Sequence, residues 1–319
     1  MKKQKQIPGQ AQDANGSNAN GSEANGSKKK KKSHRGTNLL LLLILLVGAG
    51  IAGYPAFSEY WNSMHQSRAI MGYAERVAEM SNEEYMDVWN ESLEYNRRLA
   101  ADPNPWDMSD EEMDEYEKEL NVDGTGNMGF ISIPKINVDL PIYHGTSDAV
   151  LQTSIGHIDG TSLPSGSIHN NPDDYNDVEF ASHSVLSGHR GLPSAKLFSD
   201  LDAMEEGDVF YLTILDQTLT YQVDQITVIV PEDSSELVLF PGMDYCTLMT
   251  CTPYGINTHR LLVRGRRVEN DKELLDVRVT ADALTIDPLY VVPFIAGPVL
   301  LLMIIWVVLF AGRRKKSRY

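Results

Sequence analysis

Residues 290–311 form a run of 22 residues without a charged side chain. One glycine separates this run from the basic sequence RRKKSR at 313–318. About 20 apolar residues are enough to cross a bilayer as a helix, and a basic flank after such a run is typical of a stop-transfer segment. We therefore predict a transmembrane helix at 290–311, which restricts the folded body of the chain to the residues before it.

A second apolar segment, at 39–54, follows the basic residues of 28–35. A cleavable signal peptide is the alternative, but 38 polar residues precede the segment and no A-x-A cleavage pattern follows it closely. We therefore predict an uncleaved anchor. Because basic residues flank the outer end of both segments, the positive-inside rule predicts two cytoplasmic termini and an extracellular body.

Charge is distributed unevenly along the 319 residues. The chain has 28 basic and 44 acidic side chains, and the two terminal regions, 1–54 and 312–319, hold nine and five of the basic ones but only two acids. Residues 55–311 keep 14 basic and 42 acidic side chains. Such a body repels nucleic acid, tolerates a cationic substrate group and stays soluble.

Helical and irregular patterns occupy the first part of the body. Apolar residues recur at helical spacing from residue 65 to 101, and Ser81-x-x-Glu84 is a capping box that predicts a second helix start. From 102 to 127 the sequence is irregular and proline-rich, with a short acidic helix predicted at the capping box Ser109-x-x-Glu112. Long irregular connections are commonly lids or binding elements.

Short strand-like runs begin at residue 128. They are separated by turn residues and read GFISIPKI, VDLPIYHG, VFYLTIL, LTYQVDQITVIV, YCTLMTCT and RLLVRGRRV, ending at 268. This pattern of short strands and turns predicts a mainly β domain, either an antiparallel barrel or a sandwich. The sequence VRVTAD at 277–282 is a possible further strand in the connector that follows.

Two cysteines, Cys246 and Cys251, lie in one predicted strand. Side chains five residues apart on a strand point to opposite faces, so a disulfide between them is not expected. Cys251 ends the strand beside the turn Thr252–Gly255, where a side chain is both rigidly held and accessible. Cys251 is therefore the candidate nucleophile, and Cys246 is expected to be a buried apolar residue.

An arginine is expected to face Cys251 from the next strand. Arg260 begins that strand nine residues after Cys251, and an antiparallel pairing would place its cation beside the sulfur. A neighbouring cation lowers the pKa of a thiol and donates to a developing oxyanion. Arg264 lies on the same face and is the competing candidate, but it is four residues further from the turn.

A histidine is the expected acid–base partner of a nucleophilic cysteine. His189 lies in a glycine-bounded turn before a predicted helix, LPSAKLF. The spacing alone does not choose His189 from the other histidines of the body, which are His144, His157, His169, His183 and His259.

Three segments resemble the signature of sortases, the cysteine transpeptidases of Gram-positive surfaces. They are TLMTC at 247–251, TPYGINTHRLLVRGRR at 252–267 and LSGHRG at 186–191, and the stretch 128–164 is similar to the opening of the sortase barrel. The resemblance implies a sortase-like antiparallel β-barrel with Cys251, His189 and Arg260 as the catalytic residues. No cofactor or metal is implied, because the chain has no Cys-x-x-Cys, His-Glu-x-x-His or Gly-x-x-x-x-Gly-Lys pattern.

The two anchors, the helical segment and the proline-bounded loop resemble class C sortases, which polymerise pilins. In that class a lid inserts an Asp-Pro-aromatic tripeptide into the cleft. This sequence differs, because Asn104-Pro105 precedes Trp106 and Asp102-Pro103 comes two residues earlier. The resemblance therefore implies a lid that includes Asp102, Asn104, Pro105 and Trp106, with either Asn104 or Asp102 in the place of the acid.

The resemblance predicts cleavage of an LPxTG-like sorting signal between Thr and Gly, and transfer of the acyl group to a lysine amine of a pilin subunit. The alternatives are a housekeeping sortase that attaches surface proteins to the cell wall, and an inactive adhesion or scaffold domain. The predicted organisation is a disordered basic tail (1–38), a transmembrane helix (39–54), an extracellular helical segment (55–101), a lid loop (102–127), the catalytic barrel (128–268), a connector (269–289), a transmembrane helix (290–311) and a basic tail (312–319).

Overall fold

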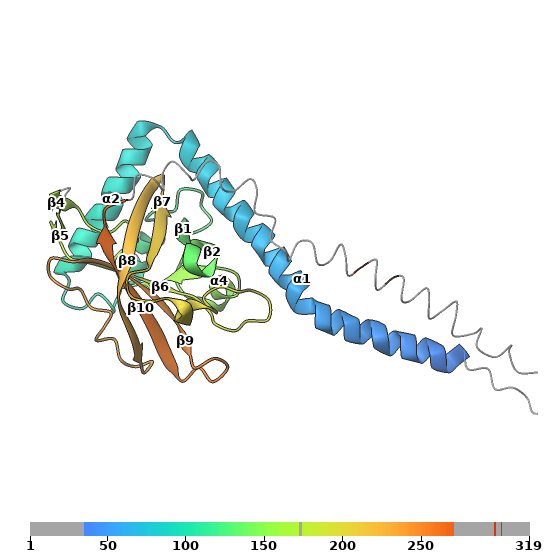
Figure 1. Cartoon of the computed structure of the whole chain (residues 1–319). Helices are drawn as coiled ribbons and strands as arrows, with labels where there is room; N and C mark the ends of the chain where they lie inside the picture. Colours follow the sequence, from blue (N-terminus) through green and yellow to red (C-terminus); the bar gives the residue numbers. More distant parts are fainter. Residues whose placement is uncertain (1–34, 172–173, 271–296, 298–300, 302–319) are drawn as a thin grey trace, which may run out of the picture. The chain divides into compact units, whose positions relative to one another are not determined.

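The computed structural model describes residues 35–171, 174–270, 297 and 301 (Figure 1). The predicted transmembrane helix at 290–311, the possible strand at 277–282 and the two tails predicted to be cytoplasmic lie outside these ranges, apart from single positions and the start of the first helix. The chain divides after Leu45 into two units, and the barrel and the candidate site described below lie in the unit that begins at Leu46.

Three helices precede the barrel: α1 (Arg35–Glu79), α2 (Asn82–Ala101) and α3 (Asp110–Tyr116). Within the described residues, one helical stretch is long and apolar enough to cross a membrane, by length and composition, and it covers Leu39–Glu79. Both spans of the predicted two-pass arrangement remain predictions.

The predicted helix starts at Ser81 and Ser109 are confirmed. The Ser109 side chain accepts from the backbone N–H of Glu112 while the Glu112 carboxylate accepts from the backbone N–H of Ser109, which completes a capping box. At α2 the Ser81 hydroxyl accepts from the Glu84 N–H at 3.2 Å, but the Glu84 carboxylate pairs with Arg76 at 2.5 Å. The Glu84 side chain therefore links α2 to α1 through its ion pair with Arg76.

Eight strands form a closed barrel in the order β1-β2-β3-β6-β9-β10-β8-β7. Their bounds are β1 Asn127–Ile133, β2 Val138–His144, β3 Ile155–His157, β6 Ser182–Ser187, β7 Val209–Ile214, β8 Gln217–Ile229, β9 Asp244–Thr252 and β10 His259–Val268. A separate hairpin pairs β4 (His169–Asn171) with β5 (Asp174–Val178). The mainly β barrel is as predicted, but it is not wholly antiparallel, because β2 pairs with β3, and β6 with β9, in parallel.

The strongly patterned strands were predictable, and the short ones were not. All six predicted strand runs occur, although Pro134–Ile136 at the end of the first is a 3-10 turn. β3, β4, β5 and β6 were not among the predicted strands, and the first three of these have only three to five residues each. The helix predicted after His189 is wrong, since turns lead instead to a short 3-10 segment at Leu201–Ala203.

Alternation along β9 and β10 fixes which side chains enter the core. Cys246 and Leu248 on β9, and Leu261 and Val263 on β10, belong to the buried cluster inside the barrel. Residues of the opposite parity therefore lie on the outer face of these two strands. Cys251, Arg260 and Arg264 share this outer face.

Candidate active site

The β9–β10 ladder sets Cys251 opposite Arg260. The two residues are directly paired in the antiparallel register, close to the turn that joins the strands. Residues directly opposite each other have Cβ atoms about 5 Å apart on the same face of the sheet. The arginine predicted to face Cys251 does so because a loop of six residues, Pro253–Thr258, closes the hairpin one pair beyond it.

The two cysteines have different environments. Cys246 is fully buried, and burial raises the pKa of its thiol well above the usual value. Cys251 is partly exposed, and both thiols are free. A thiolate is the nucleophilic form of cysteine, so the buried Cys246 is unsuited to attack a substrate and Cys251 remains the candidate.

Parallel pairing of β6 with β9 brings the His189 segment to Cys251. Ser187 pairs with Met249, and the Gly188 N–H donates to the Met249 carbonyl at 3.0 Å. The Thr250 hydroxyl donates to the Gly188 carbonyl at 2.7 Å, so the segment follows β9 beyond the last paired residues. One further residue along each strand leads to His189 and Cys251.

Gly188 is needed for this close approach. A Cβ at position 188 would lie 2.7 Å from side-chain atoms of Ile155 and Phe198. The Phe198 N–H also donates to the His189 carbonyl at 3.2 Å. The glycine before the histidine thus lets the turn sit directly on the barrel core.

Most rival histidines have structural partners. His157 and His183 are buried, each with one ring nitrogen within 2.8 Å of a backbone carbonyl oxygen, and burial lowers their pKa to about 3 and about 4. Both ring nitrogens of His144 face carbonyl oxygens, and His169 contacts Asp244. His259 pairs with Thr252 and has the opposite parity to Arg260.

Arg264 is held in a different set of contacts. It forms two hydrogen bonds with the Asp224 carboxylate, at 3.0 and 3.1 Å. Its guanidinium lies 4.3 Å from the ring centre of Tyr245 and 5.3 Å from that of Phe240. Arg260 instead donates only to carbonyls of its own turn, those of Asn257 and His259, among the hydrogen bonds described for it. The Arg260 guanidinium is therefore the better placed of the two to turn toward a substrate.

Arg190 joins the two candidate segments, a role that was not predicted from the sequence. Its side chain is 8% exposed, pairs with Asp202 and donates to the Thr252 hydroxyl at 3.2 Å. It also lies 5.9 Å from the ring centre of Tyr254, and that ring contacts Gly191. The residue after His189 is thus fastened to the residue after Cys251, which fixes the two segments relative to each other.

The predicted lid residues lie against another part of the barrel. Asp102 ends α2, and its carboxylate accepts from the Asn104 N–H at 2.9 Å. A Cβ at Gly160 would lie 2.7 Å from the Pro105 carbonyl oxygen and 3.2 Å from the Trp106 ring. The Trp106 side chain is 44% exposed.

Strand register shows how this contact relates to Cys251. The loop that contains Gly160 follows the first half of β6, since the Ile158 N–H donates to Val185 and the Ser162 N–H donates to His183. His189 follows the opposite end of β6. The position of Trp106 in the structure thus differs from the one expected over the cysteine, and occlusion of the site by this segment stays a prediction.

Cys251 and Arg260 on paired strands, with a histidine turn fastened beside them, form the set of groups required for covalent acyl transfer through a thiolate. Among the described residues, no three His, Cys, Asp or Glu side chains gather as a metal site would require. The fold and these residues define a class of β-barrel cysteine transferases.

Comparison with known proteins gives the family. A sortase domain model matches residues 131–268. Sortase C1 from Streptococcus agalactiae has 52% sequence identity and a TM-score of 0.59, over 64% of this chain and 100% of that structure. Streptococcus pneumoniae sortase C has 39% identity and a TM-score of 0.53, over 64% of this chain and 97% of that structure. Sortase A of Bacillus anthracis is 22% identical over 228 residues, which cover 72% of this chain and 92% of the relative.

The chain belongs to the sortase family and is a cysteine transpeptidase, and its structural neighbours include class C sortases.

Proposed function

We propose that the chain cleaves an LPxTG-like sorting signal between Thr and Gly and transfers the acyl group to a lysine amine of a pilin subunit. The pairing of Cys251 with Arg260, beside the fastened His189 turn, is the observation that carries this proposal. The relatives support the pilin substrate, since the structure of Streptococcus pneumoniae sortase C was described for its pilin substrate specificity.

In the first step the Cys251 thiolate attacks the carbonyl carbon of the Thr–Gly bond. The carbonyl oxygen becomes negative, and the guanidinium of Arg260 stabilises that charge. His189 gives a proton to the leaving glycine amine, and a thioester to Cys251 remains. In the second step the lysine amine attacks the thioester, His189 takes the proton of the amine, and an amide forms as the Cys251 thiolate leaves.

Exposed apolar side chains near Cys251 support a peptide substrate with apolar residues. Tyr254 and Ile256, in the turn after the cysteine, are 63% and 67% exposed. Exposed apolar groups that gather around a candidate site often contact a ligand, and the leucine and proline of a sorting signal would cover such groups.

A peptide assay tests this proposal. The full chain in detergent is mixed with a labelled LPxTG peptide and a lysine-bearing acceptor peptide, and mass spectrometry follows the glycine fragment and the new amide. We expect both products with the parent chain, and neither with Cys251→Ala, whose thermal unfolding should match that of the parent. Glycine release by Cys251→Ala, or none by the parent, would refute the proposal.

The same assay separates the alternative functions. A wall-attaching sortase would prefer amines of cell-wall peptides to the pilin lysine. An inactive scaffold would form no thioester with a peptidyl electrophile that carries the sorting signal.

We also propose that both termini lie in the cytoplasm and the barrel outside. The apolar stretch of α1 and the basic flanks of both predicted spans support this topology. Protease treatment of intact cells should remove the barrel and leave tags at both termini protected.

A further inference from the structure

A stripe of aromatic side chains runs along α1 from the end of the apolar segment 39–54. Tyr54, Phe57 and Trp61 are spaced by three and four residues, so they share one face of the helix. These three residues, which we call the aromatic stripe, are 51% to 61% exposed. The rings of Phe57 and Trp61 stack with their centroids 6.3 Å apart, and the His65 ring continues the row 4.9 Å from Trp61. The stripe is therefore an ordered apolar surface that the barrel does not cover.

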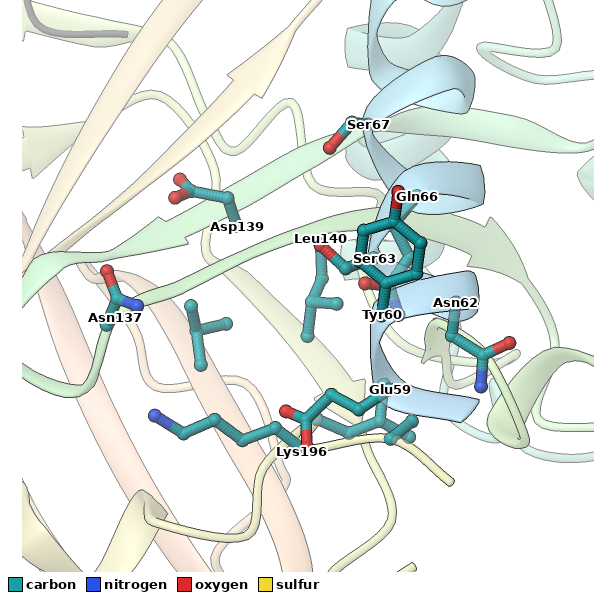
Figure 2. A pocket seen from close by; sticks show the side chains of 13 residues that line it. Glu59, Tyr60, Asn62, Ser63, Gln66, Ser67, Asn137, Asp139, Leu140 and Lys196 are labelled. Carbon is teal, nitrogen blue, oxygen red and sulfur yellow. The ribbon is translucent and has the colours of Figure 1, made fainter. Parts of the chain in front are cut away.

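Another face of the same helical turns is polar and belongs to the barrel. The Asn62 side chain donates to the Ser194 carbonyl at 2.8 Å, and the Gln66 side chain donates to the Thr153 carbonyl at 2.6 Å. Both side chains line a polar cavity between α1 and the barrel (Figure 2). Five residues of an α-helix turn it by about 140° net, so Gln66 and Trp61 lie on opposing faces. This part of α1 thus has one face bonded to the barrel and an aromatic face directed away from it.

The charges of this part of α1 are divided between the two faces. Residues 54–68 contain one acid, Glu59, and one Lys or Arg, which is Arg68. Glu59 lines the cavity on the barrel side, as Figure 2 shows. Arg68 is exposed and lies two helical turns after Trp61, on the aromatic face. The aromatic face therefore carries a cation and no acid, which suits the phosphate groups of a lipid surface.

Continuity with the apolar segment selects the partner of the aromatic face. Tyr54 ends that segment within the helix α1, which continues to Glu79. Trp and Tyr are enriched where a spanning helix leaves the hydrocarbon, because their rings have an apolar body and a polar edge. We propose that the aromatic stripe lies in the headgroup layer of the bilayer and holds the barrel at the membrane surface. The inference rests on the proposed span of α1 and does not depend on the peptide-transfer reaction.

The thickness of the headgroup layer fixes the direction of this part of α1. The layer measures about 5–7 Å on each side of the hydrocarbon, whereas seven residues of helix rise about 10 Å. Tyr54 and Trp61 can both lie in the layer only if the helix between them runs about 50° or more from the bilayer normal. Pro55 lies inside α1 at this point, and a proline within a helix permits a kink. Because α1 is bonded to the barrel, the same tilt sets the orientation of the barrel on the membrane.

Quenching of a single tryptophan tests the inference. The chain has four tryptophans, Trp61, Trp89, Trp106 and Trp306, so replacing the last three by Phe leaves Trp61 alone. The full chain is reconstituted in vesicles of phosphatidylcholine and phosphatidylglycerol, with or without a lipid that carries a doxyl quencher just below its headgroup. We expect Trp61 to lose most of its emission to the doxyl lipid and to be shielded from acrylamide in the water. A chain that keeps only Trp106, which is 44% exposed, is the control and should show the reverse.

A pair of substitutions tests whether the stripe acts as a unit. Tyr54→Ser with Phe57→Ser, in the chain that keeps only Trp61, should reduce the lipid quenching, because fewer rings hold the helix in the headgroup layer. The matched control is Met86→Ser with Val230→Ser, which removes two exposed apolar side chains outside α1 and should leave the quenching unchanged.

Three results would overturn the inference. The first is a Trp61 that the doxyl lipid does not quench; if acrylamide does not reach it either, a protein partner or a second copy of the chain covers the stripe instead. The second is equal lipid quenching of Trp61 and Trp106, and the third is unchanged quenching after the substitution of Tyr54 and Phe57.

Flotation of the vesicles separates this inference from the proposed topology. A chain that does not float with the vesicles would refute the span of α1 and the inference with it. A chain that floats but shows any of the three results above overturns the inference alone. The peptide assay of the proposed function is made in detergent, so its outcome is independent of both.

Discussion

Arg260 and Arg264 provide a paired test of the candidate site, because they lie on one strand and one face but have different partners. Arg260 is opposite Cys251, whereas Arg264 holds Asp224 and two aromatic rings. If the register argument is right, loss of Arg260 affects catalysis, and loss of Arg264 affects folding.

The expected magnitudes follow from these contacts. Removal of one oxyanion donor costs about 10²- to 10³-fold in rate, which is about 2.7–4 kcal/mol. Since the hydrogen bonds described for Arg260 go to carbonyls of an exposed turn, Arg260→Ala should change the free energy of unfolding by less than about 0.5 kcal/mol. Breaking a buried ion pair costs about 3–5 kcal/mol, and the 29% exposure of Asp224 lowers this to about 2 kcal/mol for Arg264→Ala.

Two measurements on each variant decide the matter: kcat/KM for cleavage of a sorting-signal peptide, and urea unfolding followed by circular dichroism. Arg260→Lys should restore little activity, because lysine lacks the planar fork of a guanidinium. The reasoning fails if folded Arg264→Ala loses as much activity as Arg260→Ala, or if Arg260→Ala is the less stable variant.

Four further substitutions address separate features. Cys246→Ala should retain most of the peptide-cleavage activity, and a folded but inactive variant would move the nucleophile to that position. Arg190→Gln should lower kcat about tenfold or more with a smaller change in KM, because it loosens the His189 segment without touching the peptide; an unchanged kcat would contradict this role. If the lid covers Cys251, Trp106→Ala should speed modification of that thiol by a small reagent. Equal rates in the variant and the parent would contradict a lid role for Trp106, which contacts Gly160 in the structure. Burial, with Glu91 and Glu115 nearby, raises the pKa of Glu119 to about 7, so the folded state holds a proton that the unfolded state loses near pH 4.5. Stability should therefore fall as the pH rises from 4.5 to 7. The melting temperature of Glu119→Gln should fall less across that range than the melting temperature of the parent.

Local patterns in the sequence were sufficient for the long elements. The helix starts at Ser81 and Ser109 depend on hydrogen bonds within four residues, and the long strands depend on alternation within one segment. The position of Cys251 next to a turn, and the pairing with Arg260 across it, follow from ten residues of continuous sequence. Such features need no information from distant parts of the chain.

The short strands lacked this local signal. β3 has three residues and β6 has six, and both are fixed by their neighbours in the barrel. Their parallel ladders decide that the His189 segment lies beside Cys251, since 62 residues separate the two positions along the chain. From residues and spacing alone, His189 was one histidine among several, and only the resemblance to sortases selected it.

The sequence by itself determined the mainly β class, the cysteine at a strand end and the arginine that faces it, because hairpin pairing is set by nearby residues. Only the tertiary structure decided which histidines are buried, that Arg190 joins the two candidate segments, and that Trp106 contacts Gly160. These features depend on burial and on contacts between residues that are distant in sequence, and no local pattern of side chains encodes them.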